Sequence, residues 1–179
     1  MPMKKPQTGI VGGIVMSDNK KIGQFMFGAG AIIEHPTEQK ILITKRQNTS
    51  QANHEWELVY GRVDNFEELF AGLKREVFEE TGLKDLKIKK ALRLWHFFRG
   101  EKLKETEIYG VTFICQAQTD QVKLNHEHSD FAWVSPEEAC QRIKVNGIKQ
   151  DVELYINYLE NDNLGLNLTD TKEETVTFL

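Results

Sequence analysis

The chain has 179 residues, a length typical of one domain with a full hydrophobic core. Hydrophobic residues make up 40% and charged residues 28%, which argues against a disordered chain, and no apolar run approaches the roughly 20 residues that a bilayer span needs. The net charge of −4 argues against a nucleic-acid polymer as partner, because such proteins usually carry a basic face, but it is compatible with a small anionic ligand.

The cellular compartment is predicted from the N-terminus and the cysteines. Residues 1–6 carry positive charge but are not followed by a sustained apolar core, so no secretory signal is expected. Cys115 and Cys140 lie far apart without metal-type spacing, and we interpret both as reduced structural residues. These features predict a cytoplasmic protein without a membrane partner.

The first third of the chain is rich in β-forming residues. Residues 8–16 and 22–33 predict strands separated by a turn, and a third strand is expected at residues 41–46. The polar residues 47–53 predict a loop, followed by a strand at residues 56–63.

We expect residues 1–26 to be an N-terminal strand extension of a main domain spanning residues 27–160. Strands outside a complete sheet need a partner edge, and a second subunit is a common source of one. The extension therefore predicts a homodimer.

The clearest expected element is a helix in the segment that follows Asp64 and Asn65, the two candidate N-terminal caps. Its buried stripe is formed by apolar side chains at helical spacing, namely Phe66, Leu69, Phe70, Leu73 and Val77. Gly82 follows the last turn, where glycine often ends a helix. Gly72 costs about 1 kcal/mol relative to alanine inside a helix, which indicates close packing at that position.

The remaining chain alternates between strands and helices. Strands are expected near residues 91–98, 108–117 and 131–134, and amphipathic helices after Ser135 and at residues 151–159. Residues 161–179 are predicted to form a C-terminal tail. Mixed strands with two or three helices predict an α+β fold in which helices pack on a mixed sheet.

One segment carries a specific chemical motif. Residues 61–83 read G-R-V-D-N-F-E-E-L-F-A-G-L-K-R-E-V-F-E-E-T-G-L, which resembles the Nudix box, G-x₅-E-x₇-R-E-U-x-E-E-x-G-U with U aliphatic. The fixed positions are filled by Gly61, Glu67, Arg75, Glu76, Glu79, Glu80 and Gly82, and the aliphatic ones by Val77 and Leu83. Such a match arises by chance on the order of once in 10⁹ start positions, so the motif is highly specific.

The spacing of the glutamates has a physical reading of its own. On a helix, Glu76, Glu79 and Glu80 stand at i, i+3 and i+4, so their carboxylates share one patch. Carboxylate oxygens suit Mg²⁺ or Mn²⁺, which would turn the mutual repulsion of these groups into attraction. Arg75 lies four residues before Glu79 and is expected to hold a carboxylate in place. The alternative is an acidic helix face that is only solvated. The match at the other fixed positions of the box, including Glu67, favours a metal site instead.

The resemblance to the Nudix (MutT-like) family covers about residues 27 to 160 and implies the Nudix α/β/α sandwich, a mixed sheet between helices. It also implies a Mg²⁺- or Mn²⁺-dependent hydrolase in which water attacks phosphorus and cleaves a diphosphate linkage. The implied substrate is a nucleoside diphosphate linked to another moiety. Where relatives have Pro-Gly-Gly after Trp-Glu-Leu, residues 59–61 are Val-Tyr-Gly, so Tyr60 is expected to alter the rim of the site.

Several residues outside the box are candidates for the same site. Residues 127–134 resemble the late E-H-x-D-x-x-W-V segment, whose glutamate in many relatives binds metal or accepts the proton of water, and this implies a role for Glu127. The general base is therefore either Glu80 or Glu127. Arg46 is a candidate phosphate clamp, although it could simply end a strand in solvent. Trp56 is a candidate for stacking on the substrate, with a core position as its alternative.

Two other aromatic or imidazole groups have competing interpretations. The aromatic residues 95–98 could stack on a base, but aromatic residues in strands more often belong to the core. His126 and His128 flank Glu127, and strand alternation would point them the same way. No third zinc ligand is evident, so a loop in which only Glu127 is functional is favoured.

Two alternative functions follow from the same family resemblance. An isomerase acting on isopentenyl diphosphate would need a cysteine and a glutamate arranged for proton transfer to carbon, and neither cysteine is suitably placed. A catalytically silent nucleotide sensor would be expected to lack box glutamates, which are all present here. The diagnostic proline or tyrosine that some relatives carry beyond the box is missing from residues 95–100, so the sequence predicts a small nucleotide-type substrate without choosing one.

Overall fold

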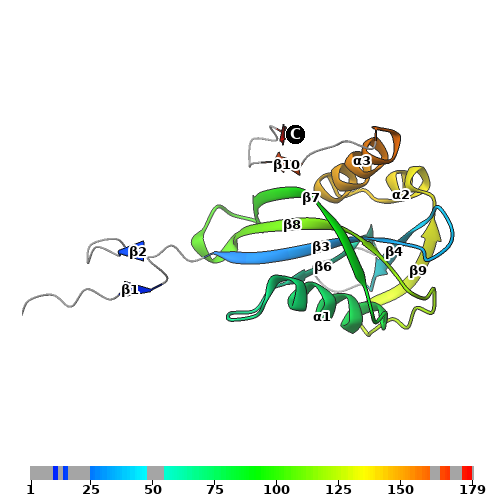
Figure 1. Ribbon diagram of the computed structural model, residues 1–179, viewed down its shortest axis with the longest axis horizontal. Helices are drawn as coiled ribbons and strands as arrows, with labels where there is room; N and C mark the ends of the chain where they lie inside the picture. The colour runs from blue at the N-terminus through cyan, green and yellow to red at the C-terminus, as the bar shows by residue number, and fades with distance from the viewer. Residues whose placement is uncertain are drawn as a thin grey trace, which may run out of the picture.

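A mixed β-sheet with helices on both faces forms the body of the molecule (Figure 1). This computed structural model describes residues 25–47 and 55–161, together with the backbone of four short strands nearer the chain ends. The strands are β1 (Ile10–Val11), β2 (Ile14–Val15), β3 (Met26–Glu34), β4 (Ile41–Arg46), β5 (Trp56–Glu57), β6 (Val59–Arg62), β7 (Lys87–Phe98), β8 (Glu107–Gln116), β9 (His128–Val134), β10 (Leu166–Thr169) and β11 (Thr175–Phe178). The helices are α1 (Leu69–Thr81), the 3₁₀ helix η1 (Lys104–Thr106), α2 (Pro136–Arg142) and α3 (Asn146–Asn161).

The main sheet has nine strands among the described residues, in the order β11-β10-β7-β8-β3-β4-β5. Strand β6 also pairs with β3, and β9 also pairs with β4. Strands β3 and β8 run parallel at the centre, whereas β7 is antiparallel to β8 and β9 to β4. The predicted mixed sheet is therefore confirmed.

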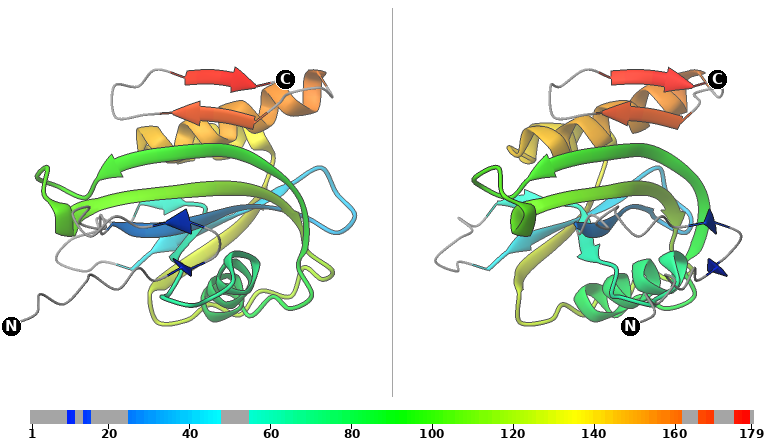
Figure 2. Two further views of the ribbon diagram at one scale, coloured as in Figure 1. Left: turned by 60° about the vertical axis from the view of Figure 1, so that its left-hand side comes forward. Right: turned by 90° about the vertical axis from the view of Figure 1, so that its left-hand side faces the viewer.

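Helices cover the two faces of this sheet. Figure 2 shows α1 on one side, and α2 and α3 on the other. Strand β3 explains why both faces must be covered, since Ala31, Ile32 and Ile33 are successive residues and all are fully buried. Successive strand residues point to opposite faces, so an apolar run of this kind requires a cover on each side. The predicted α/β/α sandwich is confirmed.

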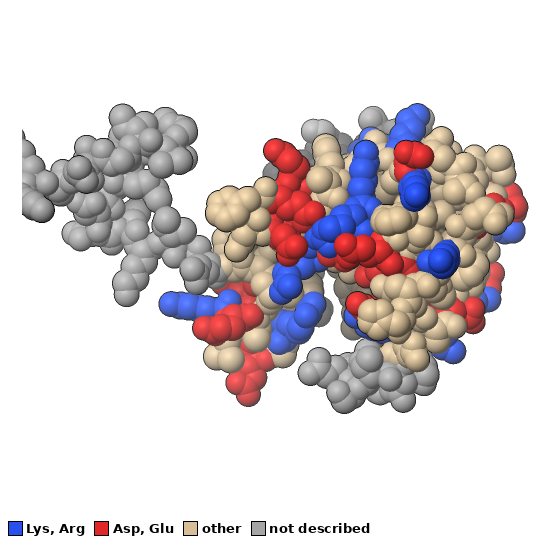
Figure 3. All heavy atoms as spheres, turned by 90° about the horizontal axis from the view of Figure 1, so that it is seen from below, with Lys and Arg blue, Asp and Glu red and all other residues tan. Residues whose placement is uncertain are grey.

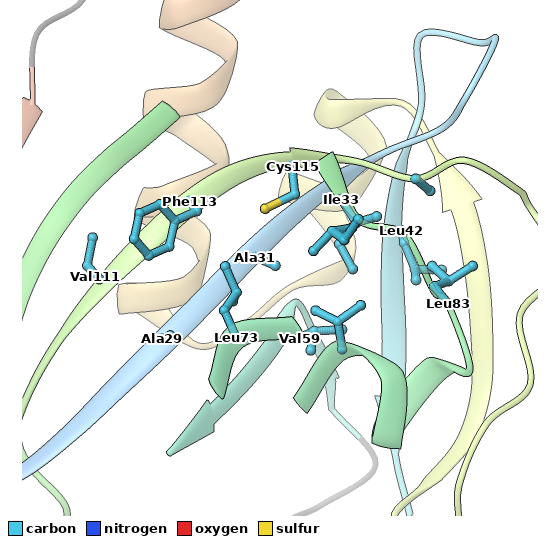
Figure 4. Close-up of a cluster of buried hydrophobic side chains, with 13 residues drawn as sticks. Ala29, Ala31, Ile33, Leu42, Val59, Leu73, Leu83, Val111, Phe113 and Cys115 are labelled. Carbon is cyan, nitrogen blue, oxygen red and sulfur yellow. The ribbon is translucent and has the colours of Figure 1, made fainter. Parts of the chain in front are cut away.

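The α1 face of the core is built from small and branched side chains. Leu73 and Val77 of α1 pack against Ala29, Ala31 and Ile33 of β3 (Figure 4). Gly72 instead faces the segment before α1, because an added Cβ atom would lie 2.8 Å from an oxygen of Glu67 and 3.3 Å from a methyl carbon of Val63. The close packing predicted at this glycine is confirmed, and it seats the helix that carries the box glutamates.

The opposite face is closed by α2 and α3. Ser135 caps α2 as predicted, since its Oγ accepts a hydrogen bond from the Glu138 backbone N–H at 3.2 Å. Val152 and Tyr155 of α3 then pack with Ile32 and other residues on this face. Helix α3 begins at Asn146, five residues earlier than predicted.

The predicted start of α1 was wrong. The helix begins at Leu69, and Asp64 and Asn65 do not cap it. Phe66 has φ +67° and is fully exposed, so it lies outside the helix and outside the buried stripe. The reason is a competing turn, in which the Glu67 carboxylate accepts a hydrogen bond from the Asp64 backbone N–H at 3.0 Å. Gly82 has φ +70° and ends the helix as predicted.

Several other boundaries differ or lie outside the description. The strand predicted at residues 56–63 is divided into β5 and β6 at Leu58, which is fully buried. The predicted turn at residues 17–20 lies outside the described residues, as does most of the predicted loop at residues 47–53. Within the segment predicted as a tail, β10 extends the main sheet beside β7, and β11 pairs with β10. No helix in the described part of the chain is long and apolar enough to cross a membrane.

Candidate active site

Helix α1 presents the three box glutamates in different environments. The Glu80 side chain is 8% exposed, whereas that of Glu79 is 53% exposed. Glu76 lies against the backbone of Gly61, where any added Cβ atom would overlap its side chain. Glycine is therefore required at position 61 so that strand β6 and Glu76 can meet.

Arg75 hydrogen-bonds several groups in the N-terminal part of the site. Its Nε and Nη2 donate to the two carboxylate oxygens of Glu67 at 2.8 and 2.9 Å, and Nη1 donates to Glu76 at 2.8 Å. Nη2 also donates to the backbone carbonyl of Arg62 at 3.0 Å. The hydrogen bonds from Arg75, and a further one from the Asp64 backbone, lower the pKa of Glu67 to about 2. The box arginine thus fixes Glu76 relative to the end of β6.

The loop before β9 passes beside the C-terminal end of α1. The backbone N–H of Lys123 donates to the Thr81 carbonyl at 2.8 Å, and that of Asn125 donates to the Glu80 carbonyl at 3.2 Å. The loop thereby satisfies two of the last four backbone carbonyls of α1, which have no partner inside the helix. Glu127 is consequently brought next to the box helix, although 47 positions separate it from Glu80 in the sequence.

Arg46 connects this loop to the sheet. Its Nη1 donates to Glu57 Oε1 at 2.9 Å and its Nη2 donates to Glu127 Oε2 at 3.2 Å. The alternative in which Arg46 simply ends a strand in solvent is therefore not what the structure shows. Glu57 had no predicted role, and the available signal was a charged residue inside the otherwise apolar stretch of β5 and β6.

Acidic side chains are concentrated around Glu80. Burial raises the pKa of Glu80 to about 9, and the surrounding carboxylates add to the effect. These carboxylates belong, in order of decreasing influence, to Glu57, Glu76 and Glu127, while Arg46 acts in the opposite direction. Ionisation of Glu80 therefore needs additional positive charge close by.

His128 is fully buried between the loop and β5. Its Nε2 lies 3.2 Å from Glu57 Oε1 and 3.9 Å from Glu80 Oε2. Its Nδ1 lies 3.3 Å from the Asn125 side-chain oxygen, which also accepts a hydrogen bond from the Glu127 backbone N–H. His126 is exposed, so the two histidines do not point the same way, and the unfavoured zinc interpretation gains no support.

The donor set nevertheless fits a hard divalent cation. Carboxylates from β5, from α1 and from the loop before β9 lie around Glu80. Because Glu80 is buried, repulsion between its carboxylate and these neighbours is costly. Oxygen donors of this kind are those that Mg²⁺ and Mn²⁺ prefer. In the described residues, however, no three acidic, histidine or cysteine side chains already converge as a ligand set. Arg46 and Arg75 instead hold several of these carboxylates in ion pairs.

Charged side chains of both signs meet on this side of the molecule. Figure 3 views the molecule from the α1 side and shows acidic and basic side chains next to one another across the middle of the face. A cleft of about 1010 Å³ opens at the N-terminal end of α1 and is lined by residues that include Phe25, Phe27, Arg62 and Phe66. Arg46, Glu57, Glu80 and Glu127 do not line this cleft, so it lies apart from the carboxylate cluster.

Tyr60 does not lie where the sequence predicted. Its ring crosses to the α3 side of the sheet, covers Gly30, and its hydroxyl donates to Asp151. The prediction that Tyr60 alters the rim of the site was therefore wrong. Glycine at position 30 leaves a hollow in the sheet that the tyrosine ring fills, because a Cβ atom there would overlap it.

The remaining aromatic candidates are placed by their neighbours. Trp56 packs on the α2 side, with the Arg142 guanidinium 5.3 Å and the Lys45 ammonium 5.8 Å from its ring centre. Trp95 is buried and lies over Gly28 and Gly110, which confirms the favoured core interpretation for this residue. Trp56 is thus partly covered by cations, and its proposed contact with substrate remains a prediction.

Comparison with known proteins defines the class. The model of the NUDIX domain family matches residues 25–154, which is most of the chain. This protein therefore belongs to the Nudix family, as the box predicted.

Individual relatives match a shorter part of the chain than the family model does. The nucleoside triphosphatase NudI of Escherichia fergusonii is 32% identical over 95 residues, which cover 49% of this chain and 66% of that protein. The NudI protein of Escherichia coli O17:K52:H18 is 34% identical over 92 residues, covering 47% of this chain and 64% of the relative. The matches thus span slightly less than two thirds of the length of these curated relatives.

Solved structures share the fold. A Nudix hydrolase from Nitrosomonas europaea has a TM-score of 0.68 at 17% identity, covering 88% of this chain and 83% of that one. The MutT protein from Methanosarcina mazei Go1 has a TM-score of 0.63 at 23% identity, covering 79% and 100%. At these identities the likeness establishes the fold alone.

Proposed function

We propose that this protein is a divalent-cation-dependent hydrolase that cleaves a phosphoanhydride linkage in a nucleoside diphosphate joined to another moiety. The observation that carries the proposal is the cluster of carboxylates around the buried Glu80, which come from β5, α1 and the loop before β9. Nucleoside triphosphates are the first substrates to test, because the curated relatives are named nucleoside triphosphatases. The cation is Mg²⁺ or Mn²⁺.

Glu76, Glu79 and Glu80 would hold the cation. When bound, such an ion neutralises charge on phosphate oxygens and lowers the pKa of the attacking water. Arg75 orients Glu76 through the 2.8 Å hydrogen bond, and Gly61 lets Glu76 approach β6. The box therefore supplies both the ligands and the groups that fix their positions.

We assign two roles at this site. Glu127 accepts the proton of the attacking water, and Arg46 binds the substrate phosphate. The Glu127 side chain is 45% exposed, so it is accessible to a water molecule, whereas that of Glu80 is 8% exposed. Arg46 lies at the same end of the site and presents a guanidinium that suits phosphate oxygens. Contact between Trp56 and the organic part of the substrate remains a prediction, because Trp56 packs on the α2 side of the sheet.

Activity measurements on a substrate panel test this proposal. Nucleoside triphosphates, nucleotide sugars, dinucleoside polyphosphates and ADP-ribose would be incubated with and without Mg²⁺, with products identified by mass in ¹⁸O-labelled water. We expect cation-dependent cleavage and a loss of at least about 100-fold in kcat for Glu80→Gln, with an unchanged circular dichroism spectrum. Near-normal turnover of this variant in Mg²⁺ would contradict the assignment of Glu80.

The proton-accepting role of Glu127 has its own test. Glu127→Gln should lower kcat by about 10²–10⁴-fold while KM and Tm stay nearly constant, and the loss should shrink at high pH. Glu160→Gln, which changes an exposed acid near the end of α3, is the matched control and should behave as wild type. If Glu127→Gln keeps its turnover from about pH 6 to 9, the proton passes to Glu80 instead.

The two alternative functions gain no support. Burial raises the pKa of the Cys115 thiol to about 12, and Cys140 lies beside Glu153 of α3, so neither cysteine is placed for proton transfer to carbon next to the box. Three of the four relatives reported above are named as a hydrolase or as triphosphatases, and the box keeps its glutamates. A cytoplasmic location and a homodimer remain predictions.

A further inference from the structure

Two residues outside the box form an ion pair at the centre of the carboxylate cluster. Glu57 Oε1 accepts hydrogen bonds from Arg46 Nη1 at 2.9 Å and lies 3.2 Å from His128 Nε2. The second terminal nitrogen of Arg46 reaches Glu127 at 3.2 Å. The Glu57 side chain is 16% exposed and that of Arg46 is 35% exposed, so the carboxylate is the more shielded partner of this pair.

We propose that Glu57 is a further member of the cation site, and that Arg46 is an internal counter-ion that offsets part of its negative charge until the cation binds. On cation binding, Arg46 gives up Glu57 and Glu127 and becomes free to bind substrate phosphate. This inference rests on the proposed function, because it concerns the same cation and the same substrate.

The balance of charge supports this assignment. Arg46 carries one positive charge and faces the carboxyl groups of Glu57, Glu127 and Glu80, so it offsets the charge of only one ionised carboxylate. The carboxylates of Glu57 and Glu80 face the same imidazole, since His128 Nε2 lies 3.2 Å from Glu57 Oε1 and 3.9 Å from Glu80 Oε2. A cation that binds Glu80 would therefore also lie close to Glu57.

The buried imidazole of His128 gives Glu57 a fixed position. His128 contacts Glu57 through Nε2 and the Asn125 side chain through Nδ1. Asn125 in turn holds the Glu127 backbone N–H at 3.0 Å. Glu57 and the loop that carries Glu127 are thus joined through one side chain, so Glu57 remains in place when Arg46 leaves.

Competition between Arg46 and the cation makes a prediction that a simple phosphate clamp does not make. If both occupy the same field of negative charge, removal of the guanidinium must strengthen cation binding, because the two effects are linked reciprocally. If Arg46 serves substrate alone, its removal leaves cation affinity in the absence of substrate unchanged.

Mn²⁺ binding to the full chain without nucleotide tests this, followed by the electron paramagnetic resonance signal of free Mn²⁺. We expect Arg46→Ala to bind Mn²⁺ about 10-fold more tightly than wild type, and Glu57→Gln to bind it about 10-fold more weakly, each equal to one factor of ten in Kd. Arg99→Ala removes the same charge at the end of β7, outside the cluster, and should match wild type. Arg46→Gln removes the charge but keeps a polar side chain and should also bind Mn²⁺ more tightly than wild type, which covers the case in which Arg46→Ala does not fold.

The outcomes separate this inference from the proposed function. Wild-type protein that binds no Mn²⁺ would overturn both. Wild-type protein that binds Mn²⁺, with Arg46→Ala no tighter than Arg99→Ala and Glu57→Gln unchanged, would overturn only the inference. Tighter binding by Arg46→Ala, together with weaker nucleotide affinity measured by calorimetry, would support the dual role of the guanidinium.

Discussion

At the scale of single residues, the site depends on how closely β6 approaches α1. Gly61 has no side chain, and this allows the Glu76 carboxylate to rest on its backbone while Arg75 holds it from the other side. The glycine of the box is thus a steric requirement for the placement of a carboxylate. Its φ angle is not in the left-handed region, so conformational freedom is not the reason for its presence.

Gly61→Ala tests this steric requirement. The added methyl group would overlap Glu76, so we expect Glu76 to be displaced and kcat/KM to fall by at least about 10²-fold, with a smaller loss of stability. Gly147→Ala is the matched control, because an added Cβ atom there meets nothing within 4 Å. Equal kcat/KM values for the two variants would show that the reaction does not depend on the position of Glu76.

Glu80 predicts how stability depends on pH. Its pKa rises on folding from 4.5 to about 9, so between these values the folded protein retains a proton that the unfolded chain releases. This contribution to stability is complete below about pH 4.5 and is lost as pH rises toward about 9, by up to about 1.4 kcal/mol per pH unit. Glu80→Gln removes the titrating group and should flatten the profile.

Thermal melts of the cation-free protein from about pH 5 to 9 measure this effect. We expect Tm to fall with pH more steeply for wild type than for Glu80→Gln, and Mg²⁺ at about pH 8 to restore wild type more than the variant. Parallel profiles for the two proteins would show that Glu80 ionises without cost in the folded state.

At the scale of elements, a buried polar network attaches α3 to the sheet. Asp151 of α3 is fully buried and accepts hydrogen bonds from Arg93 Nε and the Tyr60 hydroxyl, and from Thr112 Oγ1 at 2.7 Å. Arg93 also donates to the Gly147 carbonyl at 2.8 Å. Strands β6, β7 and β8 are therefore joined to one helix through a single carboxylate.

Asp151→Ala should destabilise the protein strongly, because it leaves the Arg93 guanidinium buried without its charge partner. The loss is about 3–5 kcal/mol for a broken buried pair, which corresponds to a fall in Tm of at least about 6 °C at this chain length. Glu160→Ala changes an exposed acid in the same helix and should leave Tm nearly constant. Similar melting temperatures for the two variants would show that the network contributes little to stability.

At the scale of the whole molecule, the N-terminal segment bears on how the protein assembles. Strands β1 and β2 pair with each other, with Ile10 opposite Val15, and form a sheet separate from the main one. A two-stranded sheet is marginally stable alone in water, so it needs a further partner. This supports the prediction that residues 1–26 contribute to a homodimer.

Sedimentation velocity at micromolar concentration tests the homodimer. We expect a dimer for the full chain and a shift toward monomer when residues 1–24 are removed. The truncated protein should keep its circular dichroism spectrum, since the NUDIX family match begins at residue 25. A full chain that sediments cleanly as a monomer would refute the prediction.

The sequence by itself determined the family, the fold class and the box helix. These follow from local patterns: the fixed spacing of Glu76, Glu79 and Glu80, the apolar spacing of Leu69, Leu73 and Val77, and the capping residues Ser135 and Gly82. Local patterns failed at Phe66, because the turn that excludes it from the helix depends on Glu67, which is held by Arg75 eight residues later.

Only the tertiary structure decided how the site is completed. Glu57, Arg46 and Glu127 lie on β5, on β4 and in the loop before β9, and their contacts with one another depend on strand pairing across long stretches of sequence. The direction of the Tyr60 side chain was likewise set by the pairing of β6 with β3, which places its ring over Gly30 on the α3 face. Sequence spacing fixes which groups share a helix face, but electrostatic fields such as the one around Glu80 sum over neighbours in space, and those neighbours are set by the packing of the sheet.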